Sequence, residues 1–465
     1  MKSQLLVSVR CPECGGSVRH LEGAYTFTCP FCASVLRIET AGVTLKYIIP
    51  SRLERSDIEE AIQVLEEGRE FTGDREIEWV VTVYKPFWYF KGMVYSCRSR
   101  GGKNDVDGRT WSYTFQANTT FAPSLHSLGL RSEVLDIEAY DSDRLEDDAV
   151  ILPVTVNKDD AEQEALDCAD RGVMDQSAQW KFHRTSIIGE KLFLIYYPIL
   201  VVSYAERDSI HATLLDGVNA TPLVESEGGL PEVGESGVKE EPYHLRIVTH
   251  RCGNCGYDLE ARDFDIIFNC KNCSRIWMLR GNNYHPIKAW LIESGNERSD
   301  VYLPFWRFEV NISSESLGVE VKSIGDFSTL MKMGRHMLRN EEPARAIRFY
   351  IPALVTRNAK ALIKLAARIG TFQKELPICR GSGLPHQRLW NASLPLEEAE
   401  EMLAPLIFQV VGRVDRKAIQ FYNDMEITVT DRQLVWYPFE ERGAYLEDAF
   451  HNYHLPKRAM DVNVY

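Results

Sequence analysis

The sequence predicts an α+β protein of repeated build, in which two small four-cysteine β-hairpin modules are each followed by antiparallel β modules with packed helices. Two observations predict this class. Eight of the 11 cysteines form four CxxC pairs, two pairs in each half of the chain. After each group of four cysteines, alternating apolar stretches typical of strands are interrupted by turns and by helix-like segments that follow a proline.

The cysteine groups, the strand-like stretches and the helix-like segments occur in the same order on both sides of one boundary, which indicates an internal repeat. The stretch from Gly217 to Pro242 is rich in Gly, Pro and Glu and has no aromatic residue, as is typical of a flexible linker. We therefore expect five segments. They are a first module at 1–40, a repeated α+β region at 41–216, the linker at 217–243, a second module at 244–280 and a second repeated α+β region at 281–465.

Length and composition limit the function classes. A chain of 465 residues with 45% apolar residues has room for two to four ordinary cores. The formal net charge of −14 disfavours a general nucleic-acid binder. The longest apolar run, Leu192–Tyr204, contains Pro198 and is shorter than the roughly 20 residues of a membrane-spanning helix. We expect no transmembrane segment and no signal peptide, whereas peripheral membrane association stays open.

The paired cysteines carry the clearest chemistry in the sequence. The first group is Cys11, Cys14, Cys29 and Cys32, and the second is Cys252, Cys255, Cys270 and Cys273. Each CxxC pair forms a tight knuckle that presents two sulfurs to one ion at about 2.3 Å, and two knuckles complete a closed tetrahedral site. The spacing therefore predicts two zinc ribbons with two structural zinc ions per chain. Metal-binding cysteines of this kind indicate a reducing compartment, so we expect a cytoplasmic protein.

Iron is the competing metal, because a rubredoxin-type site uses the same knuckles. Zinc is favoured since no flavin or nucleotide motif, neither GxGxxG nor GxxxxGK[ST], accompanies the cysteines. Four thiolates leave no open position on the ion for water. The histidines form no HExxH motif. We therefore expect that the protein is not an enzyme.

An aromatic motif with a central proline follows each cysteine group, at Tyr84–Phe90 and at Tyr302–Phe308. Trp and Tyr beside Pro could form a stacking platform for peptides or bases. Because the motif occurs at equivalent places in both halves, we expect that it packs in the core.

Short strands that end in proline lead into helices. Ile48–Pro50 precedes Ser56 and Glu59, which have the spacing of a capping box. Ile151–Pro153 precedes Asn157 and a helix-like stretch at 159–169.

A helix that follows in the second half carries a basic stripe. Its residues are Arg357, Lys360, Lys364 and Arg368, spaced three or four positions apart, and they could dock an acidic partner. A solvated helix face is the alternative.

With these cysteine groups, the strand-proline-helix unit at 48–65 and the aromatic motifs, the chain resembles a group of bacterial tandem zinc-ribbon proteins. Their ribbons are similar to those of general transcription factor B, and they are often named replication-restart-helicase-like. The resemblance implies zinc at the cysteines. It implies no helicase activity, because no helicase motif is present. Some of these proteins contain membrane spans or occur with flotillin-like scaffolds, and this chain differs from them in lacking a span.

The sequence thus favours a non-enzymatic zinc-binding scaffold or adaptor that presents surfaces to protein partners. A nucleic-acid-binding protein that uses the ribbons and the basic helix is the alternative, and a rubredoxin-like electron carrier is the third interpretation.

Overall fold

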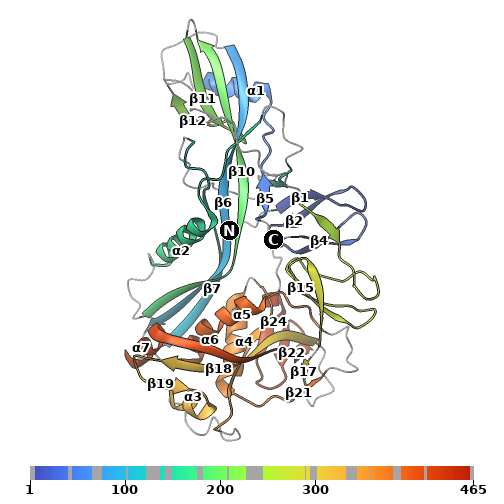
Figure 1. Cartoon of the computed structure of the whole chain (residues 1–465), viewed down its shortest axis with the longest axis vertical. Coiled ribbons are helices and arrows are strands. Elements are labelled where there is room, and N and C mark those ends of the chain that lie inside the picture. Colours follow the sequence, from blue (N-terminus) through green and yellow to red (C-terminus); the bar gives the residue numbers. More distant parts are fainter. Residues whose placement is uncertain are drawn as a thin grey trace. The chain divides into compact units, whose positions relative to one another are not determined.

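In a computed structural model, the chain forms two compact units that interleave along the sequence (Figure 1). Unit 1 comprises Met1–Lys91, Ser112–Asp167 and Lys191–Val248, and unit 2 comprises Gly92–Trp111, Cys168–Glu190 and Thr249–Tyr465. The structure describes residues 6–39, 44–64, 76–100, 103–121, 137–141, 149–174, 182–206, 209–226, 245–288, 290–293, 301–330, 343–356, 358–380, 389–412 and 416–460. The five-segment division stays a prediction, and its linker is described only as far as Ser226.

The first half of the chain is mainly β structure. Its elements are β1 (Leu6–Arg10), β2 (Ser17–Leu21), β3 (Thr26–Thr28), β4 (Val35–Ile38), β5 (Lys46–Ile48), α1 (Arg55–Val64), β6 (Glu76–Arg100), β7 (Lys103–Gln116), β8 (Ile137–Ala139), β9 (Val150–Ile151), α2 (Lys158–Met174), β10 (Phe182–Glu206), β11 (Ser209–Asp216), β12 (Pro222–Ser226) and β13 (Ile247–Thr249). The large sheet has the order β12-β11-β10-β5-β8-β1-β2, and β6 pairs with β10, β7 and β9. A smaller sheet has the order β13-β4-β3.

The second half combines two sheets with several helices. Its elements are β14 (Ile267–Asn269), β15 (Ile276–Arg280), β16 (Asn283–Ile287), β17 (Trp290–Ile292), β18 (Val301–Ser314), β19 (Val319–Val321), α3 (Ile324–Leu330), β20 (Ile347–Pro352), α4 (Ala359–Phe372), β21 (Ile378–Arg380), α5 (Leu396–Glu401), α6 (Leu403–Val411), α7 (Arg416–Asp424), β22 (Met425–Arg442), β23 (Tyr445–Asp448), β24 (His454–Pro456) and η4 (Lys457–Met460). One sheet has the order β14-β15-β16, and the other runs β19-β18-β22-β17-β21 with β20 beside β18.

The predicted mixture of helices and sheets is confirmed. Most strand pairs that the structure describes are antiparallel, as expected, but parallel pairs also occur between β1 and β8, between β5 and β10, between β6 and β9, and between β17 and β22. Each of these parallel pairs includes at least one strand of five residues or fewer and joins segments far apart in the sequence.

The aromatic motifs lie inside two buried strands, β6 and β18. Phe87, Trp88 and Phe90 are at most 4% exposed, and Phe305 and Phe308 are fully buried. Aromatic and β-branched residues fit a pleated surface that is covered on both faces. The motifs are therefore core rather than open stacking platforms.

The same hydrogen bonds surround the motif in both units. In unit 1 the Trp88 indole N–H donates to the Val156 carbonyl, 2.9 Å away, and the Ala117 N–H donates to the Pro86 carbonyl at 3.0 Å. In unit 2 the Trp306 indole donates to the Leu394 carbonyl at 2.9 Å, and the Ala353 N–H donates to the Pro304 carbonyl at 2.8 Å.

A turn that closes the sheet also has the same geometry in each unit. The Tyr197 hydroxyl donates to Asp216, and the Asp216 N–H donates to the Thr221 carbonyl at 2.8 Å. Likewise, the Tyr437 hydroxyl donates to Asp448, whose N–H donates to the Tyr453 carbonyl at 2.9 Å. In both turns the fourth residue after the aspartate is left-handed, Ala220 with φ 58° and Asn452 with φ 52°.

Two helix starts test the predicted caps. The helix-like stretch after Asn157 is found as α2, and Asn157 caps it by accepting the N–H of Asp160 at 2.9 Å. The capping box of Ser56 and Glu59 is wrong, because α1 begins at Arg55 and Ser56 lies inside it. Instead, the Asp57 carboxylate accepts the N–H of Glu54, the residue before the helix, at 2.8 Å. This is the bond that Glu59 was expected to make to Ser56, shifted two residues toward the N-terminus.

Among the described residues, the helices are all too short or too polar to cross a lipid bilayer.

Unit 2 takes part of its core from the first half of the chain. Tyr95, Cys97 and Val106 from the β6–β7 hairpin, and Phe182 and Ile188 from β10, belong to one buried cluster with side chains of the second half. The β6–β7 hairpin is also fixed by the Asn104 side chain, which donates to the Phe408 carbonyl at 2.8 Å. Residues 249–465 are therefore an incomplete unit.

We expect residues 244–465, expressed alone, to aggregate or to melt well below the whole protein, because they lack these buried side chains. Co-expression with residues 1–243 should restore a soluble complex, measured by size-exclusion chromatography and thermal unfolding. A 244–465 fragment that is monomeric and as stable alone as in the complex would contradict the interleaved division.

Candidate metal centres

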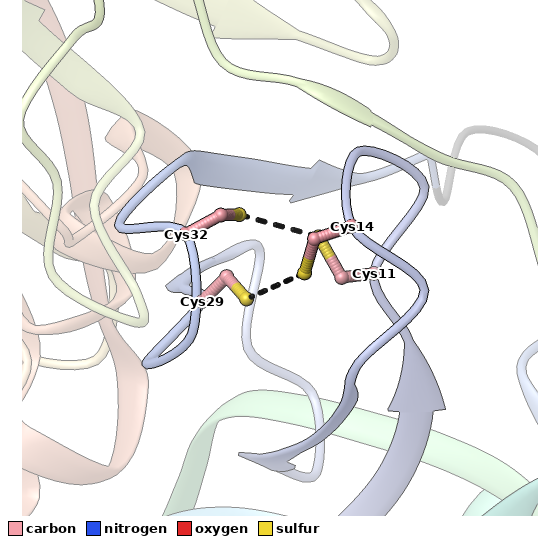
Figure 2. A group of neighbouring side chains, drawn as sticks. All are labelled: Cys11, Cys14, Cys29 and Cys32. Atoms are coloured by element: carbon pink, nitrogen blue, oxygen red, sulfur yellow. Dashed lines mark hydrogen bonds between the residues drawn. The ribbon is translucent and has the colours of Figure 1, made fainter.

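The first cysteine group is assembled from two neighbouring turns. Cys11 and Cys14 lie between β1 and β2, and Cys29 and Cys32 lie between β3 and β4. Figure 2 shows the four side chains pointing toward one common point. The Sγ atoms of Cys11 and Cys32 are 3.8 Å apart, those of Cys14 and Cys29 are 3.7 Å apart, and all four lie within 4.8 Å of one another.

The second group has the same arrangement. Cys252 and Cys255 lie between β13 and β14, and Cys270 and Cys273 lie between β14 and β15. The Sγ atoms of Cys252 and Cys273 are 3.6 Å apart, as are those of Cys255 and Cys270. Both groups come together as the sequence predicts.

These distances fit a metal ion and exclude a disulfide. A disulfide holds its sulfurs about 2.0 Å apart. Four sulfurs at about 2.3 Å from one ion define a tetrahedron whose edges are about 3.8 Å. The observed separations of 3.6–3.8 Å match that edge. Each group could therefore hold one tetrahedrally coordinated ion, and the chain could hold two.

All four knuckles share one backbone turn. In each, the N–H of the residue after the second cysteine donates to the carbonyl of the first cysteine at 2.9 Å; these residues are Gly15, Ala33, Gly256 and Ser274. All four have positive φ, between 59° and 74°. Glycine adopts this conformation freely, whereas alanine and serine do so at a cost in strain. The knuckle geometry therefore prevails over local preference in the second turn of each group.

Hydrogen bonds to sulfur favour ionised thiols at two exposed positions. The Ser34 hydroxyl and backbone N–H lower the pKa of Cys32 to about 6. The Asn272 side chain and the Tyr257 backbone N–H lower the pKa of Cys255 to about 6. These donors stabilise the thiolate, which is the form that binds metal.

Another thiol in each group resists ionisation. At Cys14 the Gly16 N–H favours the thiolate, but desolvation and the neighbouring sulfurs raise its pKa to about 12. Burial, together with the adjacent cysteines, raises the pKa of Cys270 to about 12. Four crowded thiolates repel one another, and a divalent cation supplies the charge that lets all four ionise. The donor set therefore fits a thiophilic cation.

Each module is attached to the unit that contains it. The first is joined by the pairing of β1 with β8 and by the Glu39 N–H, which donates to the Arg246 carbonyl at 3.0 Å. Gly23 in the β2–β3 turn lies so close to Phe193 that an added Cβ would come within 2.9 Å of its ring. The first module is thus packed against the large sheet.

Asn391 attaches the second module to unit 2. Its side-chain amide donates to the Glu260 carbonyl and to Asp265, both at 2.9 Å, and its oxygen accepts the Asn269 N–H at 3.1 Å. Burial raises the pKa of the Asp265 carboxyl to about 6. The Ala392 carbonyl beside it accepts the N–H groups of both Ile266 and Ile267.

The basic stripe on α4 is partly committed to ion pairs. Lys360 Nζ lies 3.1 Å from Asp105 and 3.8 Å from Asp107. Lys364 is exposed, and the exposed Arg368 guanidinium lies 4.6 Å from the centre of the Phe372 ring. Arg357 lies outside the described residues. The docking role of this stripe stays a prediction.

Sequence reasoning missed the residues that support the second centre. The Trp277 indole N–H donates to Cys252 Sγ at 3.2 Å, and Asn272 and Asn391 act as described above. Alignment of the two cysteine groups shows Trp277 and Asn272 as differences from the first module, where Leu36 and Phe31 stand. That difference is the available sequence signal.

Comparison of the chain with protein-family models, with curated proteins and with solved structures finds no match.

We expect Asn391→Ala to loosen the second module alone, because the Asn269 N–H and the buried Asp265 each lose a partner. A buried polar group without a partner costs about 1–3 kcal/mol. Amide hydrogen exchange at residues 266–270 should become faster, while residues 11–32 in the same molecule serve as the control. Unchanged exchange at 266–270, or equal acceleration in both modules, would contradict the anchoring role.

Proposed function

We propose that the protein is a non-enzymatic scaffold in which two structural zinc ions stabilise two ribbon modules on a repeated β framework that presents surfaces to protein partners. The observation that carries this proposal is the pair of four-sulfur groups at tetrahedral spacing, each attached to its own sheet. Four cysteine ligands fill the coordination sphere, so such an ion supports folding and offers no position for substrate.

Zinc and iron are the two candidate metals. Both sites sit on small β-hairpins of the ribbon type, with Cys-x-x-Cys knuckles and backbone N–H groups directed at sulfur. These features suit both metals. The preference for zinc rests on the absence of any flavin or nucleotide motif from the sequence. The resemblance to bacterial tandem zinc-ribbon proteins points the same way, and a cytoplasmic location would keep the thiols reduced.

The repeated framework supports the scaffold interpretation. The matching bonds of Trp88 and Trp306, and the matching turns at Asp216 and Asp448, are what duplication of one ribbon-plus-sheet module would produce. Two similar modules in one chain provide two sets of surfaces that can engage partners together, which raises the overall avidity.

We expect the purified protein to contain two zinc ions per chain and no iron, measured by elemental analysis. Cys14→Ser should lower the content to one zinc, because three thiolates bind the ion much more weakly than four. The matched variant Cys255→Ser should do the same through the other site. A visible absorption band from ferric thiolate would instead support the electron carrier.

Nucleic-acid binding is tested through the exposed basic side chains of α4, Lys364 and Arg368. We expect no measurable affinity for single- or double-stranded DNA or RNA at about 150 mM salt, because the chain carries a net charge of −14. The measurement is fluorescence anisotropy with labelled oligonucleotides. Micromolar binding that is lost in the double variant Lys364→Glu, Arg368→Glu, but kept in Lys417→Glu, would replace the scaffold with the nucleic-acid interpretation.

A further inference from the structure

The two cysteine groups have the same spacing, so each residue of one module has a counterpart in the other. The strands also correspond: β3 and β4 pair Thr28 with Val35, and β14 and β15 pair Asn269 with Ile276. The backbones of the two centres are therefore alike, and the centres differ in the side chains around the sulfurs.

From these differences we propose that the two metal sites are functionally unequal: the first is the site that soft electrophiles attack and that then releases its metal, whereas Trp277 and Asn272 protect the second. The inference rests on the proposed function, in that both sites must bind zinc.

Trp277 provides the first difference. Its indole N–H lies 3.2 Å from Cys252 Sγ, and both residues are buried, at 7% and 3% exposure. The ring passes beside Gly253, where an added Cβ would lie 3.4 Å from the indole. At the counterpart positions the first module has Leu36 and Pro12. Leucine has no hydrogen-bond donor, so Cys11 receives no bond from that position.

Asn272 provides the second difference. Its side chain hydrogen-bonds to the exposed Cys255. The counterpart in the first module is Phe31, which is 68% exposed and lies against Gly16, so closely that an added Cβ there would come within 2.6 Å of the ring. A phenyl ring donates no hydrogen bond to Cys14, which is exposed as well.

One donor favours the first site and must be set against these two. The Ser34 hydroxyl lies 3.4 Å from Cys32 Sγ, whereas its counterpart in the second module is Arg275. This contact is longer than that of Trp277. At matched positions the two groups have the same burial, except that Cys32 is exposed while its counterpart Cys273 is half-buried. The balance of side-chain donors and of burial therefore favours the second site.

Hydrogen bonds to a metal-bound thiolate disperse its charge and reduce its nucleophilicity. With N-ethylmaleimide as the probe, the thiolate sulfur attacks an alkene carbon, so that an S–C bond forms and the alkene π bond breaks. The electron pair moves to the neighbouring carbon, which takes a proton from water. The resulting thioether is a poor ligand, and the zinc ion leaves with its +2 charge. Because the sulfurs of the first site have fewer side-chain hydrogen-bond donors and Cys32 is more exposed than Cys273, alkylation and zinc release should be faster at the first site.

The experiment uses the full-length protein, whose zinc content is measured before reagent is added. N-ethylmaleimide is then added, zinc release is followed with a colorimetric chelator, and the modified cysteines are located by peptide mass spectrometry. We expect two phases of release: the faster accompanies alkylation within residues 11–32, and the slower accompanies alkylation within residues 252–273. The two rates should differ about tenfold or more, because hydrogen bonds to charged groups are among the stronger ones in proteins and the second site has one more side-chain donor to sulfur.

Matched variants test the cause. Trp277→Leu and Asn272→Phe copy the first module, and each should accelerate the slower phase several-fold without changing the faster one. Trp277→Phe keeps an aromatic ring but lacks the N–H, so it should act in the same direction if the leucine variant fails to fold. Trp79→Phe, at a partly exposed position of β6, is the control and should change neither phase.

The outcomes separate the two claims. Fewer than two zinc ions before reagent would refute the proposed function, and this inference with it. Two zinc ions released at equal rates, faster loss from the second site, or a slower phase unchanged in all three site variants would refute the inequality alone.

Discussion

In each unit, one buried backbone carbonyl accepts two N–H groups from the next segment of chain. The Ala117 carbonyl accepts from Thr155 and Val156, and the Ala353 carbonyl accepts from Ser393 and Leu394. Each alanine also donates its own N–H to a proline inside the aromatic strand. A backbone group buried without a partner costs about as much as a lost hydrogen bond. The segments that lead into α2 and α5 are therefore fixed to the aromatic strands, and the indoles of Trp88 and Trp306 each add a further hydrogen bond to these segments.

The two candidate metal centres lie in modules that are too small to be stable through their own cores alone. Each has only a few short strands, so packing alone stabilises it little. An ion between the four sulfurs would hold them together, and the knuckle backbones place them at the spacing that such an ion requires. The attachment to the rest of the unit, through β8 in one case and Asn391 in the other, adds what the module lacks by itself.

Local patterns could be predicted from the sequence, and contacts that depend on distant segments could not. Each CxxC pair forms its turn within a few residues, so the sequence alone predicts that the four cysteines of each group, Cys11 to Cys32 and Cys252 to Cys273, come together. The mixture of helices and sheets follows from periodicity, and the burial of the aromatic strands follows from the recurrence of their motif in both halves. Asn391 could not be found, because its partners lie more than a hundred residues earlier. Likewise, nothing local shows that Phe182 and Tyr95 pack with the second half of the chain.

The interleaving of the units has a consequence for biosynthesis. Tyr95, Cys97 and Phe182 leave the ribosome before residues 249–465 exist. At roughly 5–20 residues per second, these apolar side chains wait on the order of tens of seconds for partners such as Phe408 and Tyr422. During that interval the nascent chain exposes an apolar hairpin that its own later sequence must cover. A stalled or truncated chain would keep that surface open, which makes it a substrate for chaperones and proteases.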